Sequence, residues 1–580
     1  MTVVGIDVGG TFTDAVLLEG GRIRTAKVST TPEQEQGVLS AAAAVGGEAT
    51  HRFTHGTTVA TNAFLERKGA PTALVTTEGF EHVLHLRRQN RADLYDLGAH
   101  HPEPLVPLHR CYGVVGRIGP EGERTPLDLA TIPEIEADSI AVCLLFAFRD
   151  STHEIALADE LRRRYPEKHV VASHEVAPEF REYERASTTA ADAYLLPVVS
   201  RYLRSLAVAC RSAGLPEPLV MRSSGGLATL EEAAAHPAWI LVSGPAGGVV
   251  GAARVAQLAG FDDAISFDMG GTSTDVCLIA GGRADRSSER HVGGLPIRLP
   301  TVDIHTVGAG GGSIVWRDSG GALRVGPHSA GATPGPASYA RGGTEATVTD
   351  ANLLLERLPA ALADGLELDR DAASAAMGDV DPAAVVEVVN AEMLRALRLV
   401  SVERGHDPRE FALVAFGGAG PLHACGLAEE LGCSTVLVPE AAGVLSALGL
   451  VGSDERRDHV RSYVQPLVDV VGLPDEGEAE LRYAGQSFEL QVPLGGDLAA
   501  DFHKAHEERY GYADRSREIE LVAVRTADVV PAPELELASN LEASVAGPAR
   551  LDLAGATCWV PEGWAGQTDE NGTLRLERDR

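Results

Sequence analysis

An octapeptide that occurs twice constrains the fold of this chain more than any other feature. Residues 7–14 read Asp-Val-Gly-Gly-Thr-Phe-Thr-Asp and residues 268–275 read Asp-Met-Gly-Gly-Thr-Ser-Thr-Asp, so six of the eight positions are identical. An apolar run precedes each copy, and a second apolar run follows it. Two apolar strands around a glycine pair predict a β-hairpin with a tight turn. The chain is therefore expected to contain two related halves, each with one such hairpin.

The residue types in the repeat are those of a phosphate-binding loop. Two glycines let the backbone approach an anion and point N–H groups at it, and threonine hydroxyls add donors. The leading aspartates, Asp7 and Asp268, suit a hydrated Mg²⁺ at a strand end. Asp14 and Asp275, which end the copies, are expected to orient the turns or, alternatively, to act as a base. The predicted phosphate-binding residues are Gly9, Gly10, Thr11 and Thr13 on one side, and Gly270, Gly271, Thr272 and Thr274 on the other.

A third glycine-rich segment lies between an apolar run and a helical pattern. Residues 415–423 read Ala-Phe-Gly-Gly-Ala-Gly-Pro-Leu-His. A glycine turn before a helix lets a phosphate or planar ligand lie against the backbone, so Gly417, Gly418 and Gly420 are predicted to line an adenosine pocket; a packing turn is the alternative. Two segments rich in small residues, 244–255 and 443–449, are expected to be closely crossing helices between two lobes. This order of loops and helices is expected of the actin, Hsp70 and sugar-kinase superfamily.

Composition limits the classes of function. A length of 580 residues predicts two or three domains, and a net charge of −32 argues against nucleic acid and anionic membrane surfaces. The 50 basic residues are four lysines and 46 arginines, so the phosphate site is expected to use backbone N–H groups, hydroxyls, arginine or a metal. Seven scattered cysteines, no C-x-x-C pair, no room for a signal peptide before Val3 and no membrane-length apolar stretch predict a cytoplasmic protein.

Further segments carry a closer resemblance. The chain resembles the A subunit of the hydantoinase/oxoprolinase family, which includes the ATP-binding subunits of ketone carboxylases, from Val3 to about Gly452. Two departures stand out: Ser338 replaces a cysteine usual in the family, and the part from Ser453 onward is shorter than expected. The segments that carry the resemblance, besides the repeats, are 54–63, 88–96, 181–189, 243–248, 308–313, 326–336 and 347–352.

The resemblance implies ATP-dependent activation of a carbonyl group. The γ-phosphoryl group is expected to go to the oxygen of a cyclic amide (a hydantoin, 5-oxoproline or another lactam), and water then opens the ring with a metal-containing B-type subunit. ATP and Mg²⁺ are the implied cofactors, and an oligomer is expected. A ketone carboxylase subunit, a stand-alone small-molecule kinase and a non-enzymatic actin-like switch remain as alternatives. The substrate-side candidates are His55, for which a structural role is equally open, Arg91, Asp93, Asp350 and Asn352.

The expected fold is α/β, a two-lobed actin-like ATPase of the ribonuclease H-like kind with a small α+β C-terminal domain. Lobe I is predicted over 1–242 (family region about 3–185), lobe II over 243–452 (about 190–452) and the small domain over 453–580. Each lobe should centre on a mixed five-stranded sheet, with ATP between the lobes. Histidines at 82, 85, 100 and 101 are expected on a helix surface or loop, because no carboxylate cluster stands at ligand spacing.

Overall fold

The first octapeptide lies at the start of a mixed sheet in lobe I. The structure is a computed structural model, and it describes residues 2–10, 12–31, 33–47, 50–362, 365–533 and 543–578. Central β1 pairs antiparallel with β2, which pairs with β3, and β1 pairs parallel with β4, which is followed by β11. The bounds are β1 (Thr2–Val8), β2 (Phe12–Glu19), β3 (Arg22–Ser29), β4 (Arg52–Thr57) and β11 (Leu219–Met221).

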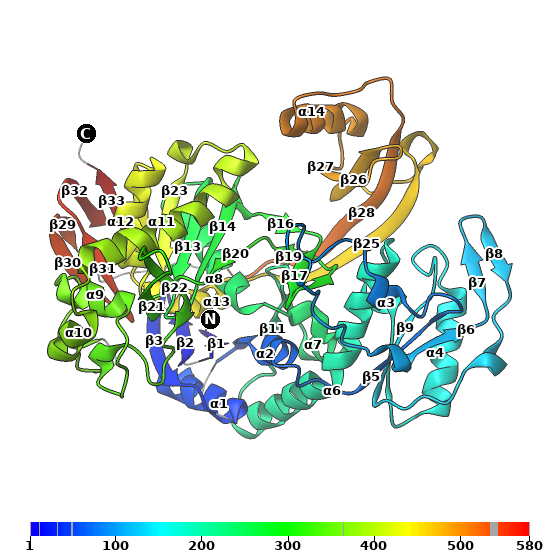
Figure 1. The fold of residues 1–580 in the computed structure, drawn as a ribbon, viewed down its shortest axis with the longest axis horizontal. Helices are drawn as coiled ribbons and strands as arrows, with labels where there is room; N and C mark the ends of the chain where they lie inside the picture. Colours follow the sequence, from blue (N-terminus) through cyan, green and yellow to red (C-terminus); the bar gives the residue numbers. More distant parts are fainter. Residues whose placement is uncertain are drawn as a thin grey trace.

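Lobe II repeats this arrangement with the second octapeptide (Figure 1). Its strands run in the order β15-β14-β13-β23-β24, with β13 antiparallel to β14 and parallel to β23. This matches the order β3-β2-β1-β4-β11 of lobe I strand by strand. The predicted mixed five-stranded core is present in each lobe, so the fold is the two-lobed actin-like α/β fold. The bounds are β13 (Ala264–Met269), β14 (Thr274–Ala280), β15 (Arg283–Ala284), β23 (Ala412–Phe416) and β24 (Thr435–Pro439).

The part of the chain after residue 452 adds strands to both sheets. β25 pairs with β12 and continues to β28, β26 and β27, so the lobe I sheet reaches ten strands, and β33 pairs with β24 and continues to β32 and β29 in the nine-stranded sheet of lobe II. Figure 1 shows these two groups, orange and red, at separate places on the molecule. Edge strands with unpaired backbone groups are covered in this way. The bounds are β12 (Leu227–Ala228), β25 (Glu455–Pro466), β26 (Glu478–Tyr483), β27 (Leu490–Pro493), β28 (Ile519–Val530), α14 (Leu498–Tyr510), β29 (Ser544–Ala546), β30 (Ala549–Leu553), β31 (Ala556–Val560), β32 (Trp564–Thr568) and β33 (Thr573–Arg578).

Two helices rich in small residues cross between the sheets, as the sequence predicts. They are α8 (Gly244–Leu258) and α13 (Leu445–Val451), and α13 also packs on β1. A Cβ on Gly449 would lie 1.9 Å from the carbonyl oxygen of Gly247, so these backbones touch. Only a residue without a side chain permits that approach.

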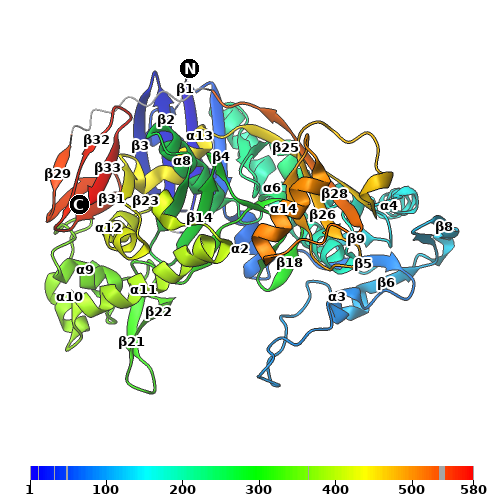
Figure 2. The same ribbon diagram turned by 90° about the horizontal axis from the view of Figure 1, so that it is seen from above.

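The outer part of lobe I holds a second, four-stranded sheet of order β10-β9-β5-β6 (Figure 2). The 31-residue helix α6 (Glu182–Ser212) packs against it. All seven cysteines of the chain are buried as free thiols. Within the described ranges, no helix is both long enough and apolar enough to cross a bilayer. The sheet bounds are β5 (Thr72–Thr77), β6 (Cys111–Val114), β9 (Ser139–Cys143) and β10 (His169–Ala172), and the remaining helices of the core are α1 (Gln34–Ala44), α2 (Val59–Leu65), α4 (Thr152–Arg164), α9 (Val348–Leu354), α11 (Pro382–Val400) and α12 (Gly420–Leu431).

Candidate functional site: two facing glycine turns

The four predicted aspartates form two equivalent cross-strand pairs. Asp7 lies opposite Asp14 in the β1–β2 hairpin, and Asp268 lies opposite Asp275 in the β13–β14 hairpin. Directly opposed residues in an antiparallel pair share one face of the sheet. The two copies of the octapeptide therefore present their aspartates in the same register.

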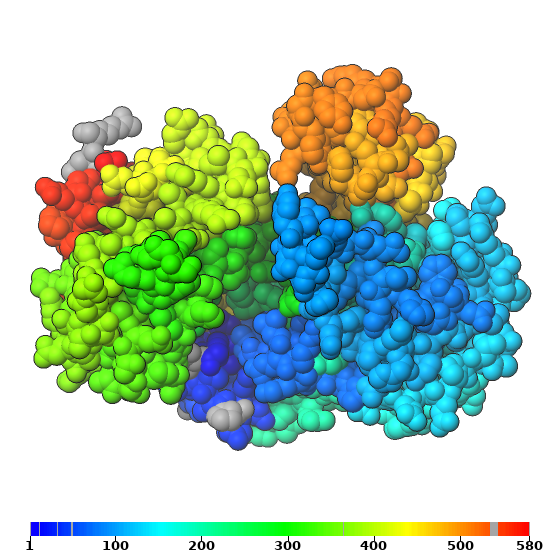
Figure 3. All heavy atoms as spheres, viewed as in Figure 1, coloured from blue at the N-terminus to red at the C-terminus, as the bar shows by residue number. Residues whose placement is uncertain are grey.

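The leading aspartate of each hairpin has a raised pKa. Burial, followed by repulsion from Asp14, raises the pKa of Asp7 to about 7. Burial raises the pKa of Asp268 to about 8, with repulsion from Asp275, Asp7 and Asp14 adding to it. The two sides also approach each other in space, because a Cβ on Gly555, in the hairpin beside Gly418, would lie 3.6 Å from Lys27 Cε. Figure 3 shows the molecule hollowed between the green residues of lobe II and the blue residues of lobe I.

Lys27 on β3 lies within this carboxylate group, which the sequence analysis did not predict. Its ammonium group forms an ion pair with Asp14 and lies 5.2 Å from the ring centroid of Phe12. The groups expected at the phosphate site from the sequence did not include this lysine. The sequence could have revealed this lysine, because counting residues outward in both directions from the Gly20-Gly21 turn between β2 and β3 places Lys27 opposite Asp14.

The first glycine turn is held by backbone and threonine contacts. The Gly9 N–H donates to the Phe12 carbonyl oxygen (2.9 Å), and the Thr30 hydroxyl donates to the Gly9 carbonyl oxygen (2.9 Å). The hydroxyl of Thr13 is buried 3.2 Å from that of Thr30, so it anchors the turn. Gly10 is exposed, and a Cβ there would meet nothing within 4 Å. Thr11, a predicted phosphate ligand, lies outside the described residues.

The second turn has the same form and an additional glycine support. The Gly270 N–H donates to the Ser273 carbonyl oxygen at 3.0 Å, as in the first turn. From beneath, Gly311 and Gly312 donate N–H groups to the carbonyl oxygens of Gly270 and Gly271, at 3.0 and 2.7 Å. These bonds use the carbonyl groups of the turn and leave its exposed N–H side for an anion. Of the threonines, Thr274 is buried and donates to the Ala309 carbonyl oxygen (2.6 Å), whereas Thr272 is exposed at the tip.

Each leading aspartate packs on a glycine of the neighbouring strand. A Cβ on Gly56, at the end of β4, would lie 2.4 Å from Asp7 Oδ1. In lobe II, a Cβ on Gly417 would lie 2.3 Å from Asp268 Oδ1. Both glycines leave room for the carboxylate and so set its position. Gly417 was predicted as an adenosine-loop residue, whereas Gly56 was missed, although it stands within a segment that carries the family resemblance.

The predicted adenosine loop adjoins the second phosphate turn. The Ala419 N–H donates to the Met269 carbonyl oxygen at 3.0 Å, and Gly420 begins α12. On the other side, the tip of the β30–β31 hairpin approaches it, because a Cβ on Gly418 would lie 3.8 Å from the Gly555 carbonyl oxygen. The loop, the second turn and this hairpin therefore lie together in lobe II.

Three of the five substrate-side candidates lie in the protein interior. His55 is fully buried, with Nδ1 3.2 Å from the Ile6 carbonyl oxygen and Nε2 2.9 Å from the Tyr202 hydroxyl, and burial lowers its pKa to about 4. Asp350 accepts N–H groups from Ser338 (2.8 Å) and Thr347 (2.9 Å) as a helix cap. These contacts agree with the structural role left open for His55, and they make Asp350 part of the cap of α9.

The third buried candidate is Asn352, and the other two candidates, Arg91 and Asp93, are exposed. Asn352 is buried in α9, where its side-chain nitrogen donates to the Val348 carbonyl oxygen at 3.1 Å. Arg91 and Asp93 lie on an exposed loop, in which Asp93 Oδ1 accepts the N–H of Tyr95 at 2.8 Å. The structure thus does not bring the five candidates together. Across the residues that the structure describes, no three His, Cys, Asp or Glu side chains come together as a metal cage.

Comparisons with known proteins agree with this arrangement. Residues 3–165 match the family model described as hydantoinase/oxoprolinase N-terminal region, and residues 185–459 match the model described as hydantoinase/oxoprolinase. The chain is 35% identical to caprolactamase subunit alpha of Pseudomonas jessenii, over 94% of this chain and 90% of that protein. The crystal structure of the ATP-dependent caprolactamase from that organism matches with a TM-score of 0.88, at 31% identity and over 100% of both chains.

Two further relatives are a 5-oxoprolinase and a subunit of a carboxylase. The chain is 33% identical to 5-oxoprolinase 1 of Arabidopsis thaliana, over 82% of this chain and 44% of that protein. It is 33% identical to the acetophenone carboxylase gamma subunit of Aromatoleum aromaticum, over 77% of this chain and 67% of that protein. With both family models spanning most of its length, this chain belongs to the hydantoinase/oxoprolinase family.

Proposed function

We propose that this chain is the ATP-binding subunit of an enzyme that uses ATP to hydrolyse a cyclic amide. The observation that carries the proposal is the pair of matched glycine turns, in each of which the leading aspartate, Asp7 or Asp268, packs on a glycine of the neighbouring strand. The similarity to caprolactamase subunit alpha and to 5-oxoprolinase supports a lactam as the substrate. ATP places its phosphates between the turns and its adenosine beside Gly417, Gly418 and Gly420.

The chemistry begins with the amide oxygen as nucleophile. It attacks the γ-phosphorus, the bond from that phosphorus to ADP breaks, and the amide becomes an O-phosphorylated imidate. Water then adds to the activated carbon, and the C–N bond of the tetrahedral adduct breaks, which releases the amine and leaves an acyl phosphate. A second water hydrolyses the acyl phosphate to a carboxylate and phosphate. Exposed N–H groups at Gly10 and Gly271 and the Thr272 hydroxyl neutralise the phosphate charge, so the contribution of the protein is positioning and electrostatics.

The residues present fit Mg²⁺. Each hairpin presents one aspartate pair, with Lys27 as the cation beside Asp14, and burial first and neighbouring carboxylates second raise the pKa values of Asp7 and Asp268. All of these donors are oxygens, the ligands that Mg²⁺ prefers. Asp7 and Asp268 would hold the ion through its water shell, and the ion would supply charge neutralisation at the phosphates. Asp14 and Asp275 then orient the turns, with general-base action by either as the alternative.

The test is ATP hydrolysis by the purified chain with and without a candidate partner subunit. Lactams, hydantoins and ketones form the panel, and wild type is compared with Asp268→Ala. Substrate-stimulated ADP release that Asp268→Ala abolishes is the expected result. Absence of nucleotide binding, even with a partner present, would refute the proposal. A stable phosphorylated product formed without a partner would instead identify a small-molecule kinase.

A ketone carboxylase is the second candidate, supported by the similarity to the acetophenone carboxylase gamma subunit. Bicarbonate-dependent ADP release with a ketone would identify it. Relatives described as subunits support a multi-subunit complex, and within it we propose a B-type hydantoinase partner. We also retain the division into lobes at 242 and 452 and the cytoplasmic location as proposals.

A further inference from the structure

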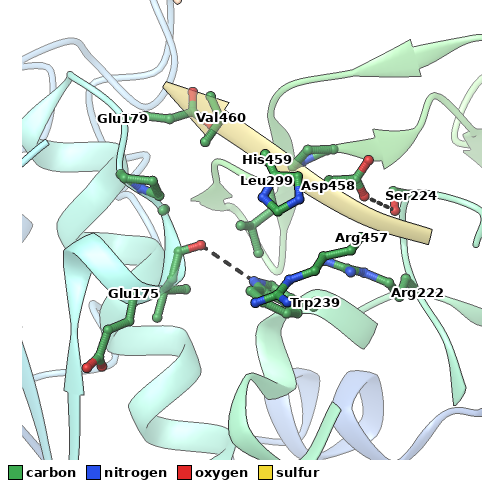
Figure 4. Close-up of a pocket in the computed structure, with 14 residues that line it drawn as sticks. Glu175, Glu179, Arg222, Ser224, Trp239, Leu299, Arg457, Asp458, His459 and Val460 are labelled. Atoms are coloured by element: carbon green, nitrogen blue, oxygen red, sulfur yellow. Dashed lines mark hydrogen bonds between the residues drawn. The ribbon is translucent and has the colours of Figure 1, made fainter. Parts of the chain in front are cut away.

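A second cavity lies apart from the glycine turns, where several parts of the chain meet. It has a volume of about 190 Å³. It is lined by residues 175–179 at and after the end of α5 (Ser173–Val176), by Arg222, Ser224 and Trp239, by the segment 299–300, and by β25. Figure 4 draws Glu179 and Val460 at the top of this pocket and Trp239 near its base. No residue of either octapeptide is among its lining residues.

Glu179, one of the residues that line this cavity, has a carboxylate oxygen without a partner. Glu179 is 1% exposed, and its Oε2 accepts hydrogen bonds from Arg298 (2.8 Å) and Arg525 (2.6 Å). Its other oxygen, Oε1, is buried without a hydrogen-bond partner. A buried acceptor without a donor destabilises the fold, and a ligand N–H that reached Oε1 would remove this penalty. Glu179 is therefore the lining residue with an acceptor for a donor group.

The opposite side of the cavity offers a cation and an aromatic surface. Arg222 is 4% exposed, and its guanidinium carbon lies 4.3 Å from the ring centroid of Trp239. Its Nη1 donates to the Arg456 carbonyl oxygen at 2.9 Å, and a guanidinium has further N–H groups for a ligand oxygen. Nearby, the Ser224 hydroxyl donates to Asp458 at 2.7 Å, as Figure 4 shows, so Asp458 is held by the protein itself.

We propose that this cavity binds a small molecule with an amide or amino N–H, which Glu179 accepts, and a carbonyl or carboxylate oxygen, which Arg222 binds. A volume of about 190 Å³ is small beside the ~300–1,000 Å³ of ordinary ligand pockets, so it selects a single ring or a short chain. The two signs of charge disfavour a purely anionic ligand. This inference rests on the proposed function, because a lactam and its ring-opened amino acid share the required chemistry.

Binding without nucleotide tests the proposal. Caprolactam and 5-oxoproline, and the amino acids 6-aminohexanoate and glutamate, are titrated into the full chain by calorimetry. Val460→Phe fills the cavity without removing a polar partner, and we expect it to raise Kd at least tenfold. Val468→Phe is the matched control, because Val468 is 86% exposed and does not line the cavity; its Kd should equal that of wild type. Circular dichroism checks that each variant is folded.

Glu179→Gln separates the two ligand sources. If the ammonium group of the amino acids contacts Glu179, the substitution should raise the Kd of the amino acids more than that of the lactams. If the ring N–H of the lactams contacts it, the Kd of the lactams should rise more. Wild-type Kd values in a folded Val460→Phe variant, or no binding of any of the four compounds to wild type, would overturn the inference. ATP titration is run in parallel: ligand binding that depends on Val460 while ATP fails to bind would leave the cavity site standing and refute the proposed function.

Discussion

Substituting Gly417 by alanine tests how the glycines set the aspartates. A Cβ there would lie 2.3 Å from Asp268 Oδ1, whereas ordinary contacts of a Cβ begin at 3.4 Å, so the carboxylate must move by about 1 Å. A displacement of about 1 Å at a reacting centre costs on the order of 100-fold in rate. Gly417 also has a φ of +78°, which costs an alanine about 1 kcal/mol of unfolding free energy. The Cβ would also lie 2.6 Å from the Met269 carbonyl oxygen, and this backbone clash adds about 1–3 kcal/mol to the loss of stability. We therefore expect about 100-fold slower ADP release together with a clear loss of stability.

Two further variants separate displacement of the carboxylate from backbone strain. Gly405 has a φ of +88° and open space around a Cβ, so Gly405→Ala should lose about 1 kcal/mol of stability and keep wild-type activity. Gly56→Ala displaces Asp7 by a similar contact at 2.4 Å and should lower activity as Gly417→Ala does. The assays are steady-state ADP release, calorimetry with ATP and Mg²⁺, and urea unfolding. Wild-type activity in Gly417→Ala, or equal losses in Gly417→Ala and Gly405→Ala, would refute the reasoning.

Three other predictions concern charge, pH and packing. Lys27→Met removes the cation paired with Asp14, so the Kd of ATP should rise about tenfold, less in high salt. Burial lowers the pKa of His55 to about 4, so as the pH falls the imidazole is protonated in the unfolded chain before it is protonated in the folded one. This difference contributes about 3 kcal/mol of unfolding free energy above pH 6.5, which should be lost as the pH falls toward 4 in urea titrations. Gly449→Ala drives a Cβ to 1.9 Å from the Gly247 oxygen and should cost about 2–3 kcal/mol in the same assay.

Each of these has a contradicting result. An unchanged Kd of ATP in Lys27→Met would remove Lys27 from the nucleotide site. His55→Gln should flatten the acid limb of the stability curve, and an unaltered limb would show that other groups dominate it. A stability change below 0.5 kcal/mol in Gly449→Ala, roughly the effect of an ordinary surface substitution, would contradict the close crossing of α8 and α13.

Sequence patterns predicted the parts of the site that depend on local order. The paired octapeptides specify both hairpins, because two apolar runs around a glycine pair set strand, turn and register within about twenty residues. The opposition of Asp7 to Asp14 and of Asp268 to Asp275 follows from that register. The close helix crossing was also predicted from residue size alone.

Side-chain direction was less accessible to sequence. Likeness to a family marked the segments around His55, Asp350 and Asn352, but all three point into the interior, where they satisfy or cap the backbone. A motif states which residues occur together and not which way each one faces. Gly56 and Lys27 were missed for a related reason, because each matters through a neighbour on another strand.

The sequence by itself determined two glycine-turn hairpins, their aspartates and the order of the loops, since these are encoded by short-range patterns. Only the tertiary structure decided that the chain after residue 452 adds β25 to β12 and β33 to β24, in two different sheets. It also decided that Glu179 and Arg525, 346 residues apart, meet beside a cavity. Such pairings bring together strands and charges distant along the chain, and their free energy comes from contacts that no local pattern records.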